Sequence, residues 1–174
     1  MGYSFLLDTP ASLAIFRQKF DILGDMEVAY CHKNGISLHR RQGTTFFPLM
    51  AVLEGGVRLP VDPLVVSTLR YYGLCLDQLP PNFYQVVSCI SRLNHTFDLQ
   101  LDHHDINHMY SLYGNKSSNY YLKTRDNRVR LISCLLDSNE NSAREFVRVR
   151  GNWCAREIPC PLSCCEVGSY RSLI

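Results

Sequence analysis

The sequence predicts an α+β fold, mainly α, in which four or five helices are followed by a small antiparallel three-stranded sheet. Three observations lead to this prediction. Apolar residues recur at helical spacing up to about residue 113, prolines and glycines delimit these segments, and the spacing changes to alternation after residue 120. With 174 residues, of which 46% are hydrophobic and 20% charged, the chain can bury the core of one globular domain. We expect the helices to pack against one face of the sheet.

The N-terminal part is expected to begin with a helix and to continue as extended chain. Thr9 and Pro10 combine a hydroxyl cap with a proline at the first helical position, which predicts a helix from there to about Phe20. Apolar residues alternate from Met26 to Tyr30 and predict a short extended segment. The polar stretch 33–45 contains an Asn-Gly pair and is expected to be a loop.

Four further helices are expected, and each has a proline, glycine or aspartate at a boundary. Proline fits the first turn because the N–H group there has no intrahelical partner, and glycine permits the left-handed conformation that ends many helices. The expected segments are Pro48 to Glu54, Pro63 to Tyr72, Asn82 to Leu93 and Asp102 to Tyr113. Gly55 and Gly56 predict a tight reversal after the first segment, and Asp62 and Gly73 are the expected caps of the second. The side chains expected in the core are Phe16, Phe20, Leu69, Val86, Ile90, Met109 and Trp153.

The last part of the chain is expected to form the sheet. Apolar and polar residues alternate in three segments, Tyr120 to Thr124, Val129 to Leu135 and Phe146 to Val149. Successive side chains of a strand point to opposite faces, so the apolar set would cover the helices and the polar set would face solvent.

Basic residues occupy polar positions of these three segments. If the strands pair, one outer face collects six cations, with Tyr121 at the same parity. Cations neutralise phosphates and aromatic rings stack on bases, so this face predicts a surface for DNA or RNA. The alternative is an ordinary solvated sheet face, where alternating polar residues belong in any case, with Glu145 at the start of the third strand. The six residues are Lys123, Arg125, Arg128, Arg130, Arg148 and Arg150.

One short string has a catalytic pattern. His104 and His108 lie four residues apart, and Asp105 stands where a zinc hydrolase has its general base. Aspartate is shorter than the glutamate of that motif, no third ligand has recognisable spacing, and Asp105 also fits a capping box with Asp102. Solvent-facing histidines are therefore favoured, with the zinc hydrolase as a remote alternative. We assign no catalytic, cofactor-binding or metal-binding residue and expect no cofactor.

Eight cysteines are present, an even number that disulfides would use. Cys75 and Cys89 stand among apolar residues, as the reduced thiols of a core do, so free thiols are favoured. The last four lack the spacing and the histidine of a zinc knuckle, and a four-thiolate site is the less favoured alternative. These four are Cys154, Cys160, Cys164 and Cys165.

The sequence also bears on location and partners. No apolar run reaches the roughly 18 residues of a membrane span, and the first residues lack the basic region of a secretory signal. We expect an intracellular protein, in the nucleus or the cytoplasm, that is not secreted and has no membrane partner. No pattern identifies a small-molecule substrate.

Three stretches resemble one known family. They are Phe16 to Val28, Leu53-Glu-Gly-Gly-Val-Arg-Leu-Pro60 with its continuation to Phe83, and Tyr120-Tyr121 with the downstream Gly151-Asn152-Trp153. Together they resemble the gypsy-type transposon (transposase) domain of plant retroelements over residues 10–155. Residues 1–9 would then be an N-terminal tail, and residues 156–174 an irregular C-terminal tail of a truncated copy.

The resemblance implies a retroelement-derived protein but no established chemistry. The expected function is accordingly a non-catalytic structural or interaction module, capsid-like or related to assembly. Nucleic-acid binding by the arginine-rich sheet face is the alternative. Self-association would use an apolar, aromatic surface of the helical half, formed by Phe83, Tyr84, Tyr71 and Tyr72.

Overall fold

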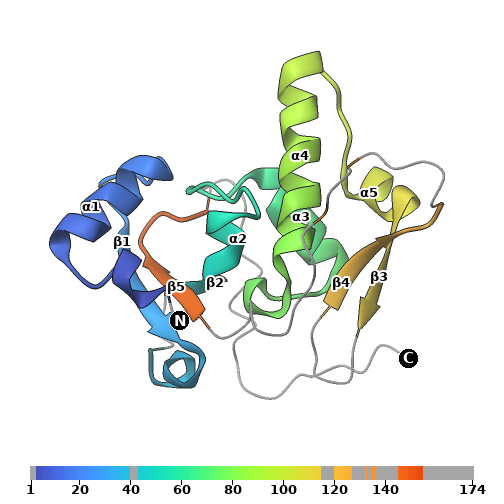
Figure 1. Cartoon of the computed structure of the whole chain (residues 1–174). Coiled ribbons are helices and arrows are strands. Elements are labelled where there is room, and N and C mark those ends of the chain that lie inside the picture. Colours follow the sequence, from blue (N-terminus) through green and yellow to red (C-terminus); the bar gives the residue numbers. More distant parts are fainter. Residues whose placement is uncertain are drawn as a thin grey trace.

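The fold is known from a computed structural model, which describes residues 3–39, 43–114, 120–126, 132, 135 and 145–154. Within these ranges the chain forms five α-helices, three 3-10 helices and five strands (Figure 1). The α-helices are α1 (Pro10–Lys19), α2 (Leu49–Leu53), α3 (Pro63–Tyr72), α4 (Pro81–Phe97) and α5 (His103–Met109). The strands are β1 (Glu27–His32), β2 (Thr44–Pro48), β3 (Tyr110–Gly114), β4 (Tyr120–Thr124) and β5 (Glu145–Arg150). The 3-10 helices are η1 (Ser4–Leu6), η2 (Lys33–His39) and η3 (Leu76–Gln78).

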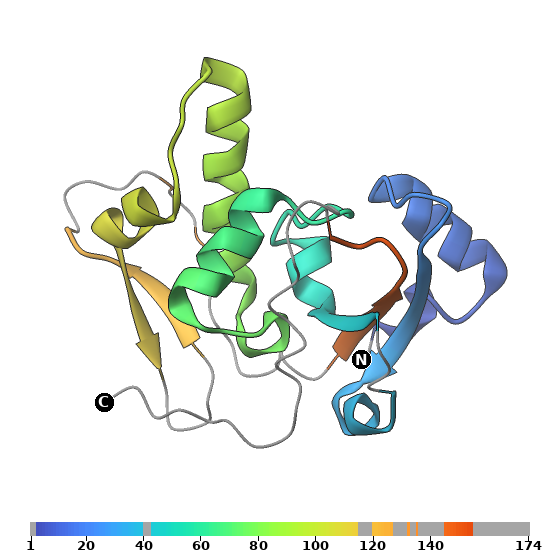
Figure 2. The same ribbon diagram turned by 180° about the vertical axis from the view of Figure 1, so that it is seen from behind.

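The strands form two separate sheets. β5 is the central strand of the first sheet and pairs antiparallel with β1 on one side and with β2 on the other. The second sheet is the antiparallel pair β3–β4. The two sheets lie on opposite sides of the molecule, with α2, α3 and α4 between them (Figures 1 and 2).

This topology corrects the predicted fold class. The strands alternate with helices along the chain, and β4 pairs with β3 while β5 pairs with two strands from the N-terminal part. A sheet built from the segments around residues 120–124 and 146–149 is therefore not formed. The prediction was wrong because alternation reveals a strand but not its partner, and roughly a third of sequential strands are not neighbours. The strand expected at 129–135 lies outside the described residues, except for Ile132 and Leu135.

Two element boundaries also differ from the prediction. α5 ends at Met109, Tyr110 has an extended backbone (φ −126°, ψ 145°), and the chain continues as β3, where a helix was expected up to Tyr113. Helical and extended patterns coincide over so short an apolar run, and tyrosine favours strands. The polar stretch 33–45, expected to be a loop, contains η2 and the start of β2.

The caps predicted for three helices are confirmed. Side-chain oxygens of Thr9, Asp62 and Asp102 accept hydrogen bonds from backbone N–H groups in the first turns of α1, α3 and α5. Gly73 ends α3 in the left-handed conformation, with φ 65°. These signals are local in sequence, so they could be recognised without knowing the fold.

Gly55 allows the chain to turn tightly after α2. A Cβ atom at this position would lie 2.6 Å from the carbonyl oxygen of Ala51 and 3.0 Å from Cβ of Tyr84 in α4. Gly56 follows with φ 77°, a conformation that side chains other than glycine rarely adopt. The reversal predicted for these two glycines is confirmed, and it places α2 directly against α4.

Most of the predicted core is confirmed. Of the seven expected residues only Met109 is half-buried, and the other six are at most 6% exposed. The main core fills the space between the β1–β5–β2 sheet, the helices and the inner face of β3–β4. A small second cluster lies on the other face of the first sheet and consists of Cys31, Ile36, Phe46 and Phe146.

The chain before α1 contacts the domain. Leu7 is buried in the main core, and the backbone N–H of Tyr3 donates to Oε1 of Glu145 at 2.7 Å. Glu145 also accepts from the hydroxyl of Tyr30 at 3.1 Å. Tyr3 and Leu7 therefore contact the folded part of the chain, within the segment expected as an N-terminal tail.

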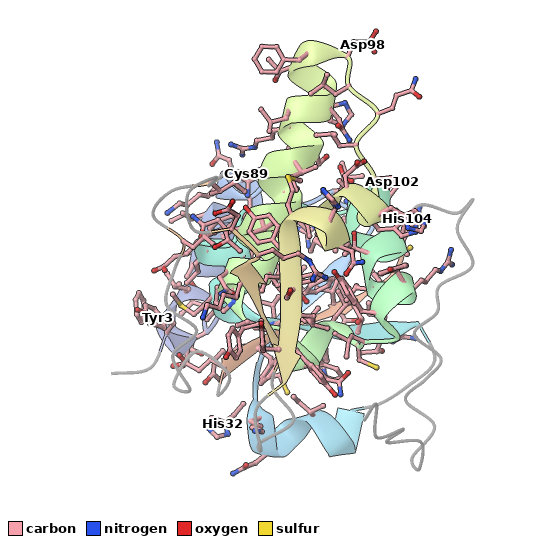
Figure 3. All side chains as sticks on the ribbon, turned by 90° about the vertical axis from the view of Figure 1, so that its right-hand side faces the viewer. Tyr3, His32, Cys89, Asp98, Asp102 and His104 are labelled. Atoms are coloured by element: carbon pink, nitrogen blue, oxygen red, sulfur yellow. The ribbon has the colours of Figure 1, made fainter. Side chains whose placement is uncertain are left out.

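α4 projects beyond the rest of the molecule at its C-terminal end, where Asp98 marks the tip (Figures 1 and 3). The chain reverses at Asp98, which has φ 51°, and the amide side chain of Asn94 exchanges two hydrogen bonds with the backbone of Leu101. Phe97 and Leu99 at this tip are 65% and 44% exposed. Across the described ranges, every helix is too short or too polar to cross a membrane.

Candidate nucleic-acid interface

The β3–β4 sheet has one core face and one solvent face. Tyr110 and Leu122 belong to the core face and are 0% and 3% exposed. Residues that alternate with these along each strand point the other way, and the cross-strand register brings them together on the solvent face. Arg125 extends the pairing, because its backbone N–H donates to the Met109 carbonyl oxygen. We call this face the β3–β4 surface; its residues are Ser111, Tyr113, Tyr121, Lys123 and Arg125.

Two tyrosine rings stack on the β3–β4 surface. Tyr113 and Tyr121 are directly opposite each other in the register, with ring centroids 5.8 Å apart and planes inclined by 23°. Tyr113 is 47% exposed. Cross-strand aromatic pairs of this kind stabilise a sheet, but a ring this exposed also offers a contact surface to a ligand.

Two cations follow the tyrosine pair along β4. Lys123 and Arg125 are both exposed, and the ion pairs among the described residues involve neither of them. Nε of Arg125 donates to the carbonyl oxygen of Asn107 in α5 at 2.9 Å. A guanidinium carries several N–H donors, so this bond orients the side chain while other donors stay available for an anion.

A second group of rings lies where α3 meets α5. The ring centroid of Tyr71 is 4.9 Å from that of His103 and 5.3 Å from that of His104, and the two imidazoles are 4.3 Å apart. We call Tyr71, His103 and His104 the ring cluster. Tyr71 is 42% exposed, and His104 lies at the edge of the molecule beside Asp102 (Figure 3).

Asn107 joins the ring cluster to the β3–β4 surface. Its Nδ2 donates to the Tyr71 hydroxyl at 3.1 Å, its Oδ1 accepts from the Tyr72 hydroxyl at 3.3 Å, and its carbonyl accepts from Arg125. Burial raises the pKa of Tyr72, and the neighbouring Tyr71 raises it further, against a lowering effect of Arg125. Tyr72 therefore stays protonated at neutral pH and can act as the donor in this network.

The structure divides the six predicted cations. Lys123 and Arg125 lie together on the β3–β4 surface, whereas Arg148 and Arg150 lie on β5 in the other sheet. The six-cation face was expected from direct pairing of these strands, and it is not formed that way because β4 and β5 belong to different sheets. Arg128 and Arg130 lie outside the described residues.

Arg148 and Arg150 have an acidic neighbour. Nη2 of Arg148 lies 3.0 Å from Oε1 of Glu27, and Nη1 of Arg150 lies 3.9 Å from Oε2 of the same carboxylate. Glu27 is directly opposite Arg150 in the register, so one carboxylate serves both cations. The charge of this pair is therefore partly neutralised by Glu27.

Sequence reasoning missed Tyr113 as a partner of Tyr121 and missed the ring cluster. The alternation of Tyr110, Leu112 and Gly114 with Ser111 and Tyr113 was the available sign of a strand, and it was assigned to the end of a helix. The ring cluster had no comparable sign, since Tyr71 and the two histidines come from different helices.

The histidine string that suggested zinc has a structural explanation. Oδ2 of Asp105 accepts the backbone N–H of Asp102 at 2.9 Å, which confirms the capping box predicted for these two residues. His104 and His108 are exposed. Over the described part of the chain, no three histidine, cysteine, aspartate or glutamate side chains are grouped so that they could hold a metal ion.

The structure also bears on the predictions for the cysteines and for a self-association surface. Cys31 and Cys89 are free thiols, whereas Cys134 and the cysteines after residue 155 lie outside the described residues.

Phe83 and Tyr84, expected on a surface for self-association, are both 0% exposed and belong to the core. That surface is therefore not formed, although Tyr71 itself is exposed.

Comparison with models of protein families gave no match for this chain, and neither curated proteins nor solved structures gave one. The similarity to the gypsy-type transposon domain thus stays a hypothesis that rests on the residues of the sequence.

Proposed function

We propose that this chain is a non-catalytic interaction module that binds nucleic acid through the β3–β4 surface. The observation that carries the proposal is the placement of the exposed Lys123 and Arg125 beside the stacked pair of Tyr113 and Tyr121. Cations neutralise phosphates, and aromatic rings provide faces on which bases stack. A paired sheet holds these groups in place before a ligand arrives, which reduces the entropy cost of binding.

The proposal includes an origin in a plant retroelement. Its support is the resemblance of residues 10–155 to the gypsy-type transposon domain, which implies no established chemistry. A module of this kind would act by holding nucleic acid, without a reaction of its own.

The alternative is that the β3–β4 surface is only the solvated side of a small sheet. Polar and charged residues occupy such faces in most antiparallel sheets, so their presence alone does not decide the matter. Salt dependence separates the two interpretations, because only a surface that contacts phosphates releases counterions on binding.

The test compares two variants in binding to a fluorescently labelled oligonucleotide at several salt concentrations. In the double variant Lys123→Gln/Arg125→Gln we expect weaker binding, and a plot of log affinity against log salt that is shallower by about 0.7 for each cation removed. Arg150→Gln is the matched control, because this exposed arginine lies in the other sheet next to Glu27, and its slope should equal that of the parent. Binding of the parent without a salt slope, or an unchanged double variant, would contradict the proposal.

A further inference from the structure

The ring cluster is exposed in a way that packing between two helices does not require. Tyr72 already fills the contact between α3 and α5, since it is half-buried, packs edge-on against Tyr71 at 5.1 Å and donates its hydroxyl to Asn107. Tyr71, one residue earlier, remains 42% exposed with two imidazoles next to it. The cluster therefore places aromatic faces at the surface in addition to the rings that hold the helices together.

The Tyr71 ring is held by a side-chain hydrogen bond, and the backbone that carries the imidazoles is held by the helix cap. Nδ2 of Asn107 donates to the Tyr71 hydroxyl, and the backbone N–H of His104 donates to the Asp102 carboxylate at 2.7 Å. This order matters because a platform that is already partly held loses less entropy when a base stacks on it.

Arg125 contacts Asn107, the residue that also binds the ring cluster. It follows Tyr121 and Lys123 on one face of β4, and its Nε is bonded to Asn107, whose side chain contacts Tyr71. Two aromatic sets, Tyr113–Tyr121 and the ring cluster, are thus connected through a pair of cations. Stacking faces that flank phosphate-binding cations are the pattern of sites for single strands.

Building on the proposed function, we infer that the ring cluster is a base-stacking subsite and that the ligand is a single-stranded nucleic acid with unpaired bases. Lys123 and Arg125 contact the backbone of the strand, while Tyr71 and the imidazoles receive a base on one side and the tyrosine pair receives another. A duplex presents its phosphates to the cations but keeps its base faces stacked inside, so it gains nothing from the ring cluster. Beside the cluster, Oδ1 of Asp102 and Oδ2 of Asp105 accept backbone N–H groups in the capping box.

The experiment measures binding of one sequence as a single strand of about 12 nucleotides and as the corresponding duplex, in DNA and RNA. The parent protein should bind the single strand more tightly. Tyr71→Ala should weaken single-strand binding about tenfold and leave duplex binding and the salt slope unchanged, because stacking releases no counterions. Tyr71→Trp, which keeps a ring, should retain most of the affinity. His104→Phe and His104→Ala form a second pair, in which only the alanine variant should lose affinity.

The outcomes separate this inference from the proposed function. If the Lys123→Gln/Arg125→Gln variant loses affinity while Tyr71→Ala does not, the β3–β4 surface binds nucleic acid and the stacking subsite is refuted. Equal affinity of the parent for single strand and duplex refutes it as well. If no nucleic acid binds the parent, both proposals fail. Near-ultraviolet circular dichroism of each variant verifies that the fold is retained.

Discussion

Asp102 shows how one carboxylate starts a helix and orders its neighbours. Its Oδ1 accepts the backbone N–H groups of His104 and Asp105, at 2.7 and 3.3 Å. The bond from His104 is the largest cause that lowers the pKa of Asp102 below its ordinary value of 3.8, and the bond from Asp105 acts in the same direction. The charged form is therefore the one that the folded chain stabilises.

The pH dependence of this cap can be predicted. A lowered pKa in the folded state contributes stability that is present above about pH 3.8 and is lost as the pH falls through the folded value. Asp102→Asn keeps an oxygen that can cap α5 but does not titrate. The difference in urea midpoint between the parent and this variant should therefore decrease when the pH is lowered from about 5 to below 3. A difference that stays constant over this range would show that the carboxylate charge does not contribute.

At the scale of single residues, the sequence could reveal only features whose partners are close along the chain. Thr9, Asp62 and Asp102 were recognisable as caps because their partners lie within three positions, and Gly73 ended its helix for the same reason. The ring cluster was not recognisable, because nothing near Tyr71 in the sequence indicates that two histidines from a later helix will lie against it.

At the scale of elements, the helices were predictable and one helix end was not. α3 and α4 begin at prolines and carry apolar stripes long enough to distinguish a helix from a strand. The five residues of β3 satisfy both patterns, so only their pairing with β4 determines that they are extended. That pairing is also what creates the β3–β4 surface, so the candidate site depended on the least predictable boundary.

Asp62 connects α3 to α4, which gives an element-scale prediction. Its Oδ1 accepts the N–H of Leu64 at 2.8 Å, and its Oδ2 accepts the hydroxyl of Ser91 in α4 at 2.5 Å. Ser91 is 7% exposed, so loss of its partner leaves a buried hydroxyl without an acceptor. We expect Asp62→Ala to lower the free energy of unfolding by about 2 to 4 kcal/mol, as the sum of a lost cap and a lost hydrogen bond to a charged group.

Urea denaturation of matched variants measures this effect. Asp62→Asn keeps one oxygen that can accept the Leu64 N–H and adds an NH2 group that can donate to the Ser91 hydroxyl, so it should cost clearly less than Asp62→Ala. Ser91→Ala removes both the hydroxyl and the need for an acceptor, so it should cost less than Asp62→Ala, and the double variant should show a non-additive sum. Additive costs would mean that Asp62 and Ser91 act independently and that the contact between α3 and α4 does not depend on them.

At the scale of the whole molecule, β5 closes a sheet whose other two strands come from the opposite part of the chain. Its partners lie at residues 27–32 and 44–48, on the order of a hundred residues earlier in both cases. The sequence indicated β1 and β5 as extended segments, but it did not indicate which strands pair or which strand is central. Pairing over such a separation depends on loop closure and on the shape of the rest of the core, which neighbouring residues do not encode.

The two sheets should consequently differ in how they open. β5 is hydrogen-bonded on both sides, and Val147 and Val149 are 0% exposed, so its amides should exchange with solvent only when the whole domain unfolds. The β3–β4 sheet has two strands and an exposed end at Tyr113 and Gly114, and isolated two-stranded sheets are marginally stable. Native-state hydrogen exchange should therefore show local opening of β3–β4 at a lower free energy than that of β5.

Adding a single-stranded oligonucleotide extends this prediction to function. A ligand that binds only the closed β3–β4 sheet must stabilise that sheet against local opening by mass action. Protection of the β4 amides against exchange should rise with ligand concentration. Protection of the β5 amides, whose exchange follows global unfolding, should rise by the same amount or less. If the β4 amides are as protected as those of β5 without ligand, the sheet is not a separate opening unit. A rise confined to α4 would instead place the nucleic acid at the projecting helix and away from the β3–β4 surface.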